Sequence, residues 1–91
     1  MKLQWTSKGH DDLVLLHAFL AKSDPAAAAR AARALVAAPE RLLSQPRIGE
    51  ALDGFEPREV RRLIVGRYEL RYEIRSKIII VIRIWHTREN R

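Results

Sequence analysis

The chain of 91 residues contains no cysteine. This absence excludes disulfide frameworks, Cys-ligated zinc, iron–sulfur clusters and thiol catalysis. Long hydrophobic runs are also missing, because the longest, Ile78 to Ile82, is far too short to cross a membrane. The first residues turn polar at once and lack the apolar stretch of a signal peptide. We therefore expect a cytoplasmic protein with no membrane partner.

The charge of the chain is strongly basic. Lys and Arg number 17 against 11 Asp and Glu, which gives a net charge of +6, and 13 of the 17 basic residues are Arg. The planar guanidinium of Arg binds phosphate and carboxylate groups through two parallel hydrogen bonds. This composition indicates an acidic partner, either a nucleic acid or an acidic protein.

The length of the chain predicts a single domain over residues 1–91 with one modest core. A hydrophobic fraction of 47% argues against disorder. No group of His, Asp and Glu has a persuasive metal-ligand spacing, so we expect no metal and no cofactor.

The N-terminal part predicts a short strand followed by a helix. Lys2 to Trp5 has apolar residues at period two, and Thr6 or Ser7 is placed to cap the helix that follows. Asp11 and Asp12 lie near the start of the helical pattern, where carboxylates suit the positive end of the helix dipole. The helical pattern contains one apolar stripe. Its members are Leu13, Leu16 and Leu20, and Phe19 widens it.

A second helix begins at the dipeptide Asp24-Pro25, because Asp caps a helix N-terminus and Pro suits the first helical position. The alanine-rich segment Ala26 to Ala38 is strongly helix-forming. Pro39 is expected to kink or break this helix. Gln45 to Pro57 contains two prolines and two glycines and predicts a loop.

The remainder of the chain predicts three strands: Arg58 to Val65, Arg67 to Arg75 and Ile78 to Trp85. The last is the most apolar, so we expect it to be central in the sheet. The middle strand alternates between apolar and charged residues, which is typical of a half-buried antiparallel strand. Its core-facing residues are predicted to be Tyr68, Leu70, Tyr72 and Ile74.

The order of elements is therefore β-α-α-β-β-β, an α+β fold with two helices packed on one face of a twisted antiparallel sheet. The other face is expected to be open and to carry Arg71, Arg83 and one of Arg61 or Arg62. Two interpretations of this face stay open: a functional basic patch, or a solvated face whose charges pair with one another. The alternating charged residues are Arg67, Glu69, Arg71, Glu73 and Arg75.

Several short motifs, in order and spread over nearly the whole chain, carry a resemblance to a known family. They are Trp5-Thr6, Asp12-Leu13, Phe19-Leu20-Ala21, Asp24-Pro25 with Ala26 to Arg30, Gln45 to Gly49, Val65 to Tyr68 with Leu70 and Tyr72, and Ile82 to His86. In these motifs the chain resembles the RelE/ParE superfamily of toxins from type II toxin–antitoxin systems.

The resemblance implies a RelE/ParE-like fold and a small cytoplasmic toxin that arrests growth, as in plasmid stabilization. Its implied partner is a cognate antitoxin, usually acidic and partly disordered, in a toxin–antitoxin hetero-oligomer. A disordered segment that folds on binding can cover a large basic surface, so the charge of this chain agrees with such a partner.

The superfamily implies two mechanisms. ParE-like members bind DNA gyrase, whereas RelE-like members are metal-independent endoribonucleases that cut messenger RNA on the ribosome. The motif Gly66-Arg67-Tyr68 looks more ParE-like. Glu69, which follows it, departs from the RelE-like nuclease pattern, because its carboxylate would repel phosphate. The first hypothesis is therefore gyrase inhibition.

His86 resembles a catalytic His of some RelE-like nucleases and would act as general acid or base if the chain is a nuclease. Otherwise it is a residue at a strand end. A third hypothesis is a non-toxic member of the family that only binds its antitoxin. The arginines expected to contact RNA or a protein partner are Arg61, Arg62, Arg67, Arg71 and Arg83.

Overall fold

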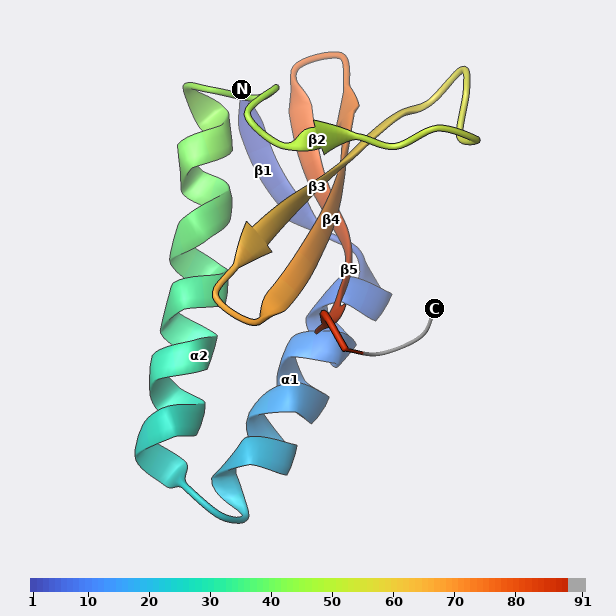
Figure 1. The fold of residues 1–91 in the computed structure, drawn as a ribbon. Helices are drawn as coiled ribbons and strands as arrows, with labels where there is room; N and C mark the ends of the chain where they lie inside the picture. Colours follow the sequence, from blue (N-terminus) through green and yellow to red (C-terminus); the bar gives the residue numbers. More distant parts are fainter. Residues whose placement is uncertain (89–91) are drawn as a thin grey trace.

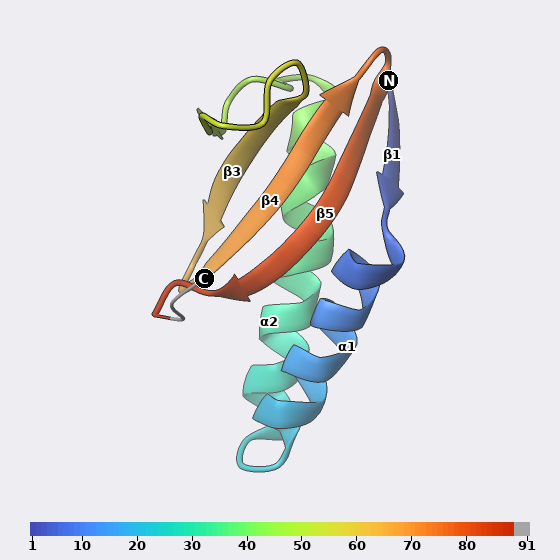
Figure 2. The same ribbon diagram turned by 90° about the vertical axis from the view of Figure 1, so that its right-hand side faces the viewer.

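The computed structural model describes residues 1–88 of the chain. Two helices lie against one face of a five-stranded sheet (Figures 1 and 2), which confirms the predicted α+β architecture. No helix in residues 1–88 is long and apolar enough to cross a membrane. The elements are β1 (Lys2–Trp5), α1 (Ser7–Ala21), α2 (Pro25–Ala37), the 3-10 helix η1 (Ala38–Leu43), β2 (Glu50–Ala51), β3 (Glu59–Val65), β4 (Tyr68–Arg75) and β5 (Ile78–His86).

Both helices begin at capping residues that the sequence indicated. Thr6 is the N-cap of α1 and its hydroxyl accepts a hydrogen bond from Gly9 N, while the Asp24 carboxylate accepts one from Ala27 N. The expected place of Asp11 and Asp12 is wrong, because the helix starts at Ser7 and its first turn contains no acidic residue. These two carboxylates therefore lie too far along α1 to interact with the positive end of its dipole.

The connection from α2 to the sheet is more ordered than a loop. Because Pro39 cannot continue an α-helix, α2 ends at Ala37 and the chain tightens into η1. Within the expected loop, Glu50 and Ala51 form the short strand β2 beside β3. Nothing in the local sequence distinguishes these two residues from their neighbours, since their strand partner comes later in the chain.

The sheet has the order β1-β5-β4-β3-β2. The strands from β5 to β2 are antiparallel, as predicted, but β1 pairs with β5 in parallel, so the sheet as a whole is mixed. β5 has a neighbour on each side, and β4 is the middle strand. Two-residue turns join the last three strands, with left-handed backbone at Gly66 (φ 61°) and Ser76 (φ 55°).

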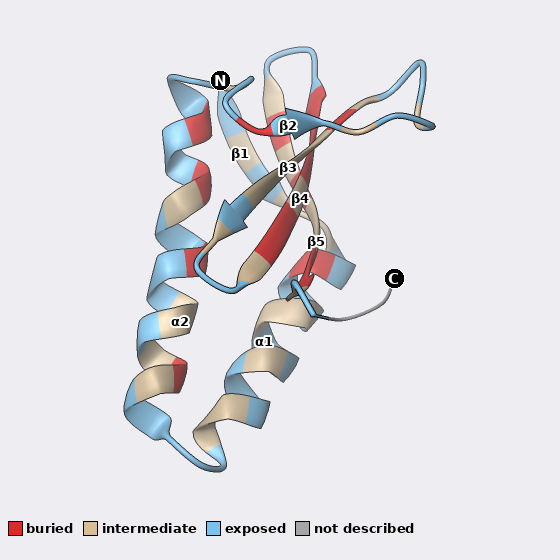
Figure 3. Cartoon of the chain, viewed as in Figure 1, coloured by how far each residue is buried: buried red, intermediate tan, exposed pale blue. Residues whose placement is uncertain are grey.

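The core lies between the helices and the sheet (Figure 3), and the predicted inward face of β4 is confirmed. Leu35 of α2 and Leu42 of η1 pack against it. The expected place of Phe19 in the core-facing stripe is wrong, because its side chain is 72% exposed. The halves of α1 and α2 nearest their connection extend beyond the end of the sheet (Figure 2), so the sheet does not cover that part of α1. The buried core residues are Leu35, Leu42, Leu70, Tyr72, Ile74, Ile79, Val81 and Ile84.

An irregularity in β5 decides which residues of that strand face the helices. Arg71 of β4 is paired with Arg83, but the next residue, Tyr72, is paired with Val81, so Ile82 is an extra residue in β5. Beyond this bulge the alternation is reversed. Ile84 therefore faces the helices, and Arg83 faces the open side of the sheet with Arg71.

The first turns of α1 take the place of a strand along the free edge of β5. β1 is paired with β5 only as far as Val81. From there Thr6 donates its backbone N–H to Val81 O (2.9 Å) and its hydroxyl to Ile82 O (3.0 Å). Asp12 continues the edge by accepting from Ile84 N (2.9 Å) and Arg83 Nε (2.8 Å). The carboxylate thus satisfies a backbone donor that would otherwise be unpaired.

We predict that Asp12→Ala destabilises the fold by about 2 kcal/mol, because it leaves the N–H of Ile84 and the guanidinium of Arg83 without this acceptor. The neighbouring substitution Asp11→Ala is a matched control, because the side chain of Asp11 is 72% exposed and that of Asp12 only 13%. Urea unfolding followed by tryptophan fluorescence measures both. Equal midpoints for the two variants would contradict the structural role of Asp12.

Candidate functional site

The open face of the sheet carries Arg62 rather than Arg61. Arg62 is paired with Arg71 across β3 and β4, on the side away from the helices, and Arg71 is paired with Arg83 across β4 and β5. Arg61 is paired with the core residue Tyr72 and therefore points to the helix side. The structure thus brings three of the five candidate arginines to one face.

Buried glutamates neutralise most of this open face. Glu69 accepts from Arg62 (3.3 Å) and from Arg71 (3.1 Å), and Arg62 also pairs with Glu50 at 2.6 Å. Ionised side chains are seldom buried unless paired, and Glu69 meets that condition through two guanidinium groups. For these arginines the salt-bridged interpretation of the alternating charges describes the free protein.

Glu73, four residues beyond Glu69 in β4, is likewise buried and paired with two arginines. Arg58 and Arg75 donate to its carboxylate at 2.8 and 3.1 Å. The hydrogen bond from Arg58 is the largest effect on this group and holds the pKa of Glu73 below its ordinary value, against the opposing effect of burial.

Aromatic rings cover the guanidinium of Arg71 on the open face. Its central carbon lies 4.6 Å from the ring centre of Trp85 and 5.6 Å from that of Phe55, which comes from the segment between β2 and β3. Arg71 Nε is buried without a hydrogen-bond acceptor in the described part of the chain. Arg83 lies over Trp85 at 6.0 Å while bound to Asp12. These two arginines are therefore held in place by the protein itself.

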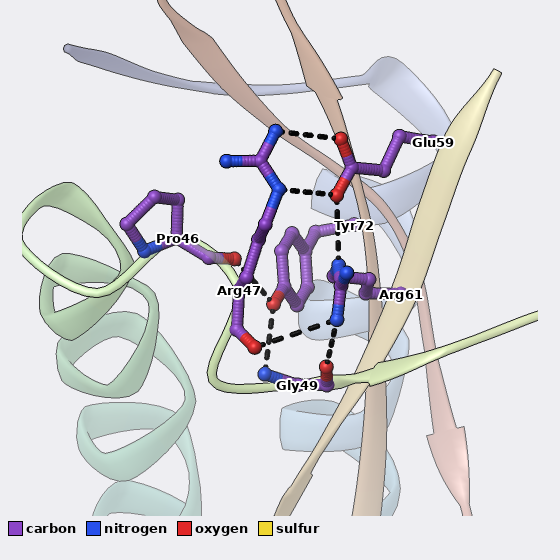
Figure 4. Close-up of polar contacts among 6 residues, drawn as sticks. All are labelled: Pro46, Arg47, Gly49, Glu59, Arg61 and Tyr72. Carbon is purple, nitrogen blue, oxygen red and sulfur yellow. Dashed lines mark hydrogen bonds and ion pairs between the residues drawn. The ribbon is translucent and has the colours of Figure 1, made fainter.

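Arg61 belongs to a network that fixes the segment before β2 to the sheet (Figure 4). It donates to Glu59 (2.9 Å) and to Gly49 O (2.7 Å), and Arg47 reaches the same Glu59 carboxylate with two hydrogen bonds of 2.9 Å. These bonds, those from Arg47 first, lower the pKa of Glu59. Arg61 thus has a structural role on the helix side, although the sequence made it a candidate for the open face.

The hydroxyl of Tyr72 completes this network. It donates to Pro46 O (2.8 Å) and accepts from Gly49 N (3.0 Å), and burial raises its pKa. Glycine is required at position 49 because a Cβ there would lie 2.6 Å from both Arg62 O and the Tyr72 hydroxyl. The segment from Pro46 to Gly49 can therefore lie directly on the sheet.

His86 lies on the opposite face from the arginines of the open side. It is paired with Tyr68 at the end of β4, and the two rings meet edge to face with their centres 5.4 Å apart. Its Nδ1 accepts a hydrogen bond from Arg88 N at 3.0 Å. The ring lines a groove beside α1 that is otherwise mainly apolar.

Arg67 is the most accessible of the five candidate arginines. It lies in the turn between β3 and β4, is exposed, and has no ion-pair partner among residues 1–88. Its carbonyl accepts from Thr87 N at 2.9 Å, which holds the turn beside the end of β5. This guanidinium is therefore available to a partner's carboxylate or phosphate without first breaking an internal pair.

The structure does not gather the candidates into one catalytic group. Arg62, Arg71 and Arg83 share the open face, Arg61 is fixed on the helix side at the level of Tyr72, and His86 lies at the far end of that same side. Cleavage of RNA needs a base and phosphate-binding cations around one phosphodiester. Within residues 1–88, no three His, Asp or Glu side chains come together as metal ligands.

The roles of two sets of residues were not predicted from the sequence. Phe55 and Glu59 took no part in it because their partners, Arg71 and Arg47, are 16 and 12 positions away in the chain. The exposed apolar surface of α1 at Leu15 and Phe19 was not predicted, although six of the eight residues from 13 to 20 are Leu, Val or Phe, which is more than one buried stripe needs.

Comparison with known proteins identifies the family. A family model described as "ParE toxin of type II toxin-antitoxin system, parDE" matches residues 3–91. The chain belongs to the ParE toxin family. A solved structure described as "Chromosomal ParDE TA system from P. aeruginosa" is similar to it, with a TM-score of 0.79 and 24% identity over 94% of this chain and 95% of that chain. At this identity the likeness shows the fold alone. No curated protein matches the chain.

Membership of the ParE family makes the chain the toxin component of a type II toxin–antitoxin system, with an antitoxin protein as its partner. It also confirms the resemblance drawn from the sequence motifs. The candidate arginines and His86 are therefore side chains of a protein that has a protein partner.

We predict that acid weakens this ParE family member through Glu73 and Glu59. Both have a folded-state pKa below the ordinary value of 4.5, so their contribution to stability is complete above that value and is lost as the pH falls below it. Glu73→Gln should be less stable than wild type at pH 7 and should lose less stability between pH 5 and 3. Urea unfolding at each pH tests this, and the exposed Glu40→Gln variant, the control, should follow wild type.

We predict that Tyr72→Phe destabilises the protein by about 1–3 kcal/mol, because Gly49 N and Pro46 O lose their buried partner. Tyr68→Phe is the matched control, since its hydroxyl makes no hydrogen bond within the described residues and its ring contact with His86 is retained. Thermal unfolding followed by circular dichroism compares the two. A larger effect at position 68 would contradict the assigned network.

Proposed function

We propose that this toxin arrests growth in the cytoplasm by binding and inhibiting DNA gyrase, and that its antitoxin neutralises it by binding the toxin directly. Gyrase is the proposed target because ParE-like members of the superfamily bind it. It requires a protein-binding surface and no catalytic group.

The placement of His86 carries this proposal. His86 packs edge to face on Tyr68 in an apolar groove, while Arg62, Arg71 and Arg83 occupy the other face of the sheet. A phosphodiester bound by those arginines would have the sheet between itself and the imidazole. The arrangement therefore favours binding of a protein over cleavage of RNA.

Among the candidate arginines, we assign direct contact with a partner to Arg67 first and Arg62 second. Arg67 is exposed and has no ion pair within residues 1–88, and Arg62 is half-buried between Glu50 and Glu69. Arg61, Arg71 and Arg83 contribute by holding the surface in shape, through Glu59, the ring of Trp85 and Asp12. An acidic partner would gain most from a cation that has no internal pair to lose.

We predict that induced expression of wild type and of His86→Gln arrests growth equally, with gyrase-linked DNA breaks and intact messenger RNA. The reason is that a gyrase-binding surface needs no proton transfer from His86. The measurements are mapping of DNA breaks and of RNA 5′ ends in the same cultures, with inhibition of supercoiling by purified toxin as the direct assay.

Three results would change the assignment. Cuts in translated messages that disappear in His86→Gln would establish a RelE-like nuclease. Vigorous growth at full expression, with a folded toxin, would indicate a member that only binds its antitoxin. Arrest without either DNA breaks or RNA cuts would reject gyrase as the target.

A further inference from the structure

Basic residues gather at the end of the sheet where β1 begins and β4 turns into β5 (Figure 2). Lys2 is paired with Ile78, and Ile78 is paired with Arg75 on its other side. Arg58 directly precedes β3 and, in the register of that strand, lies beside Arg75. The turn between β4 and β5 adds Lys77. The basic row formed by Lys2, Lys77, Arg75 and Arg58 thus crosses four adjacent strands.

Among residues 1–88, a single carboxylate pairs with these four cations. Glu73 is shared by Arg58 and Arg75. Its side chain is only 4% exposed, whereas those of the two arginines are 47% and 64% exposed, so a partner arriving from solvent meets the guanidinium groups first. Lys2 and Lys77 are exposed and have no ion pair within the described residues. The basic row therefore carries an excess of positive charge.

The exposed acids that precede Arg58 do not pair with the row. They lie in the loop between β2 and β3, which projects from the sheet (Figure 1). Within this loop the Glu56 carboxylate accepts a hydrogen bond from Gly54 N at 3.0 Å. Glu56 thus has a donor of its own, and the guanidinium of Arg58 is bound to Glu73 instead.

A hollow of about 530 Å³ lies between the two lysines of the row. The backbone holds them together, because Lys2 N donates to Lys77 O at 2.9 Å. Ser76, in the turn, lines the hollow with both lysines and with Met1 and Ile78. Ammonium groups and a serine hydroxyl are hydrogen-bond donors to phosphate oxygens. The lining of this hollow therefore includes the groups that a phosphate binds.

The kinds of residue in the row distinguish between acidic partners. None of the four residues, and none that lines the hollow, is aromatic. Single-stranded nucleic acids bind on aromatic side chains that stack with their bases. Protein interfaces are anchored by aromatic residues and are depleted of Lys. The backbone of a nucleic-acid duplex needs only cations, so a duplex is the partner that this row fits.

We propose that the basic row binds the phosphate backbone of duplex DNA, so that the toxin contacts DNA as well as gyrase. Adjacent strands lie about 4.8 Å apart, so a row across four strands is about 14 Å long and faces about four phosphates of one DNA strand, spaced about 3.4 Å along the axis. Phosphate contacts carry no sequence information, so any duplex should bind. The inference rests on the proposed function only in taking DNA, the substrate of gyrase, as the duplex.

The four lysines of the chain make a footprint direct, because they form two matched pairs. Lys2 and Lys77 belong to the row, whereas Lys8 and Lys22 are exposed on α1 and at its C-terminal end. The probe is a short DNA duplex of mixed sequence at low salt. The reagent is an amine-reactive ester, and mass spectrometry gives the rate of acylation at each lysine of wild-type toxin.

With saturating duplex we expect acylation of Lys2 and Lys77 to slow by about tenfold, and that of Lys8 and Lys22 to be nearly unchanged, because only the first pair would be covered by phosphates. Unchanged rates at Lys2 and Lys77 overturn the proposal. Equal slowing at all four lysines also overturns it, because DNA would then respond to the net charge of the toxin and not to the row.

Charge removal tests the row independently. The variant Lys2→Gln with Lys77→Gln should bind duplex about tenfold more weakly at low salt, and the slope of log K against log salt should fall in magnitude by about 2, since two phosphate contacts are lost. Lys8→Gln with Lys22→Gln is the control with the same change in net charge and should bind like wild type. Fluorescence anisotropy of labelled duplex measures both, and equal weakening by the two variants would reject the row.

Other polyanions test the class of partner. The row is assigned to the wrong nucleic acid if single-stranded DNA or RNA protects Lys2 and Lys77 at a lower concentration than duplex does. Protection of the same two lysines by polyglutamate, at a lower concentration of charge than duplex requires, would assign the row to an acidic protein and reject DNA.

The outcomes separate this inference from the proposed target. Gyrase inhibition by a toxin whose Lys2 and Lys77 stay reactive on duplex rejects the row alone. Protected lysines in a toxin that does not inhibit gyrase reject the target alone. Where wild-type toxin does inhibit supercoiling, the row variant should need about tenfold more toxin than the α1 control, because the DNA contact adds to the contact with gyrase. Equal inhibition by the two variants would overturn the contact with DNA on gyrase.

Discussion

The docking of the first turns of α1 on the edge of β5 is the constraint on which the rest of the structure depends. β1 pairs with only half of β5, and beyond Val81 the backbone would be an open edge. Thr6 and Asp12 supply the missing partners from a helix instead of a strand. The close approach requires Gly9, because a Cβ there would lie 2.8 Å from Val81 O. Since α2 packs on α1, this contact also sets the position of the second helix and of the apolar groove.

The bulge at Ile82 lies in the same part of β5 and determines which residues of the strand each face of the sheet carries. With regular alternation, Arg83 and Trp85 would share the face of Val81 and point into the core, and His86 would lie among the arginines. The extra residue reverses this, so Trp85 becomes the support for Arg71 and His86 becomes a neighbour of Tyr68. One inserted residue thus separates the imidazole from the guanidinium groups that a nuclease would need beside it.

Features determined by neighbouring residues were predictable from sequence, and features determined by distant partners were not. The Asp24-Pro25 helix start, the break at Pro39 and the alternation of β4 each depend on a few adjacent residues, and the structure confirms them. The parallel pairing of β1, the strand β2 and the choice between Arg61 and Arg62 depend on register with segments far along the chain. Phe19 was misplaced because its helical spacing suits a core, while the sheet ends before it can cover that turn.

The distribution of charge indicates that the open face of the sheet is not the surface that attracts an acidic partner most strongly. On that face Glu50, Glu69 and Glu73 offset most of the arginines, and Arg83 is held by Asp12. The net charge of +6 therefore resides mainly elsewhere. Arg67 and the lysines of α1 carry part of it, next to the largest exposed apolar side chains of the helix. Uncompensated charge steers association and apolar burial holds a complex together, and the α1 side of the toxin combines these two features.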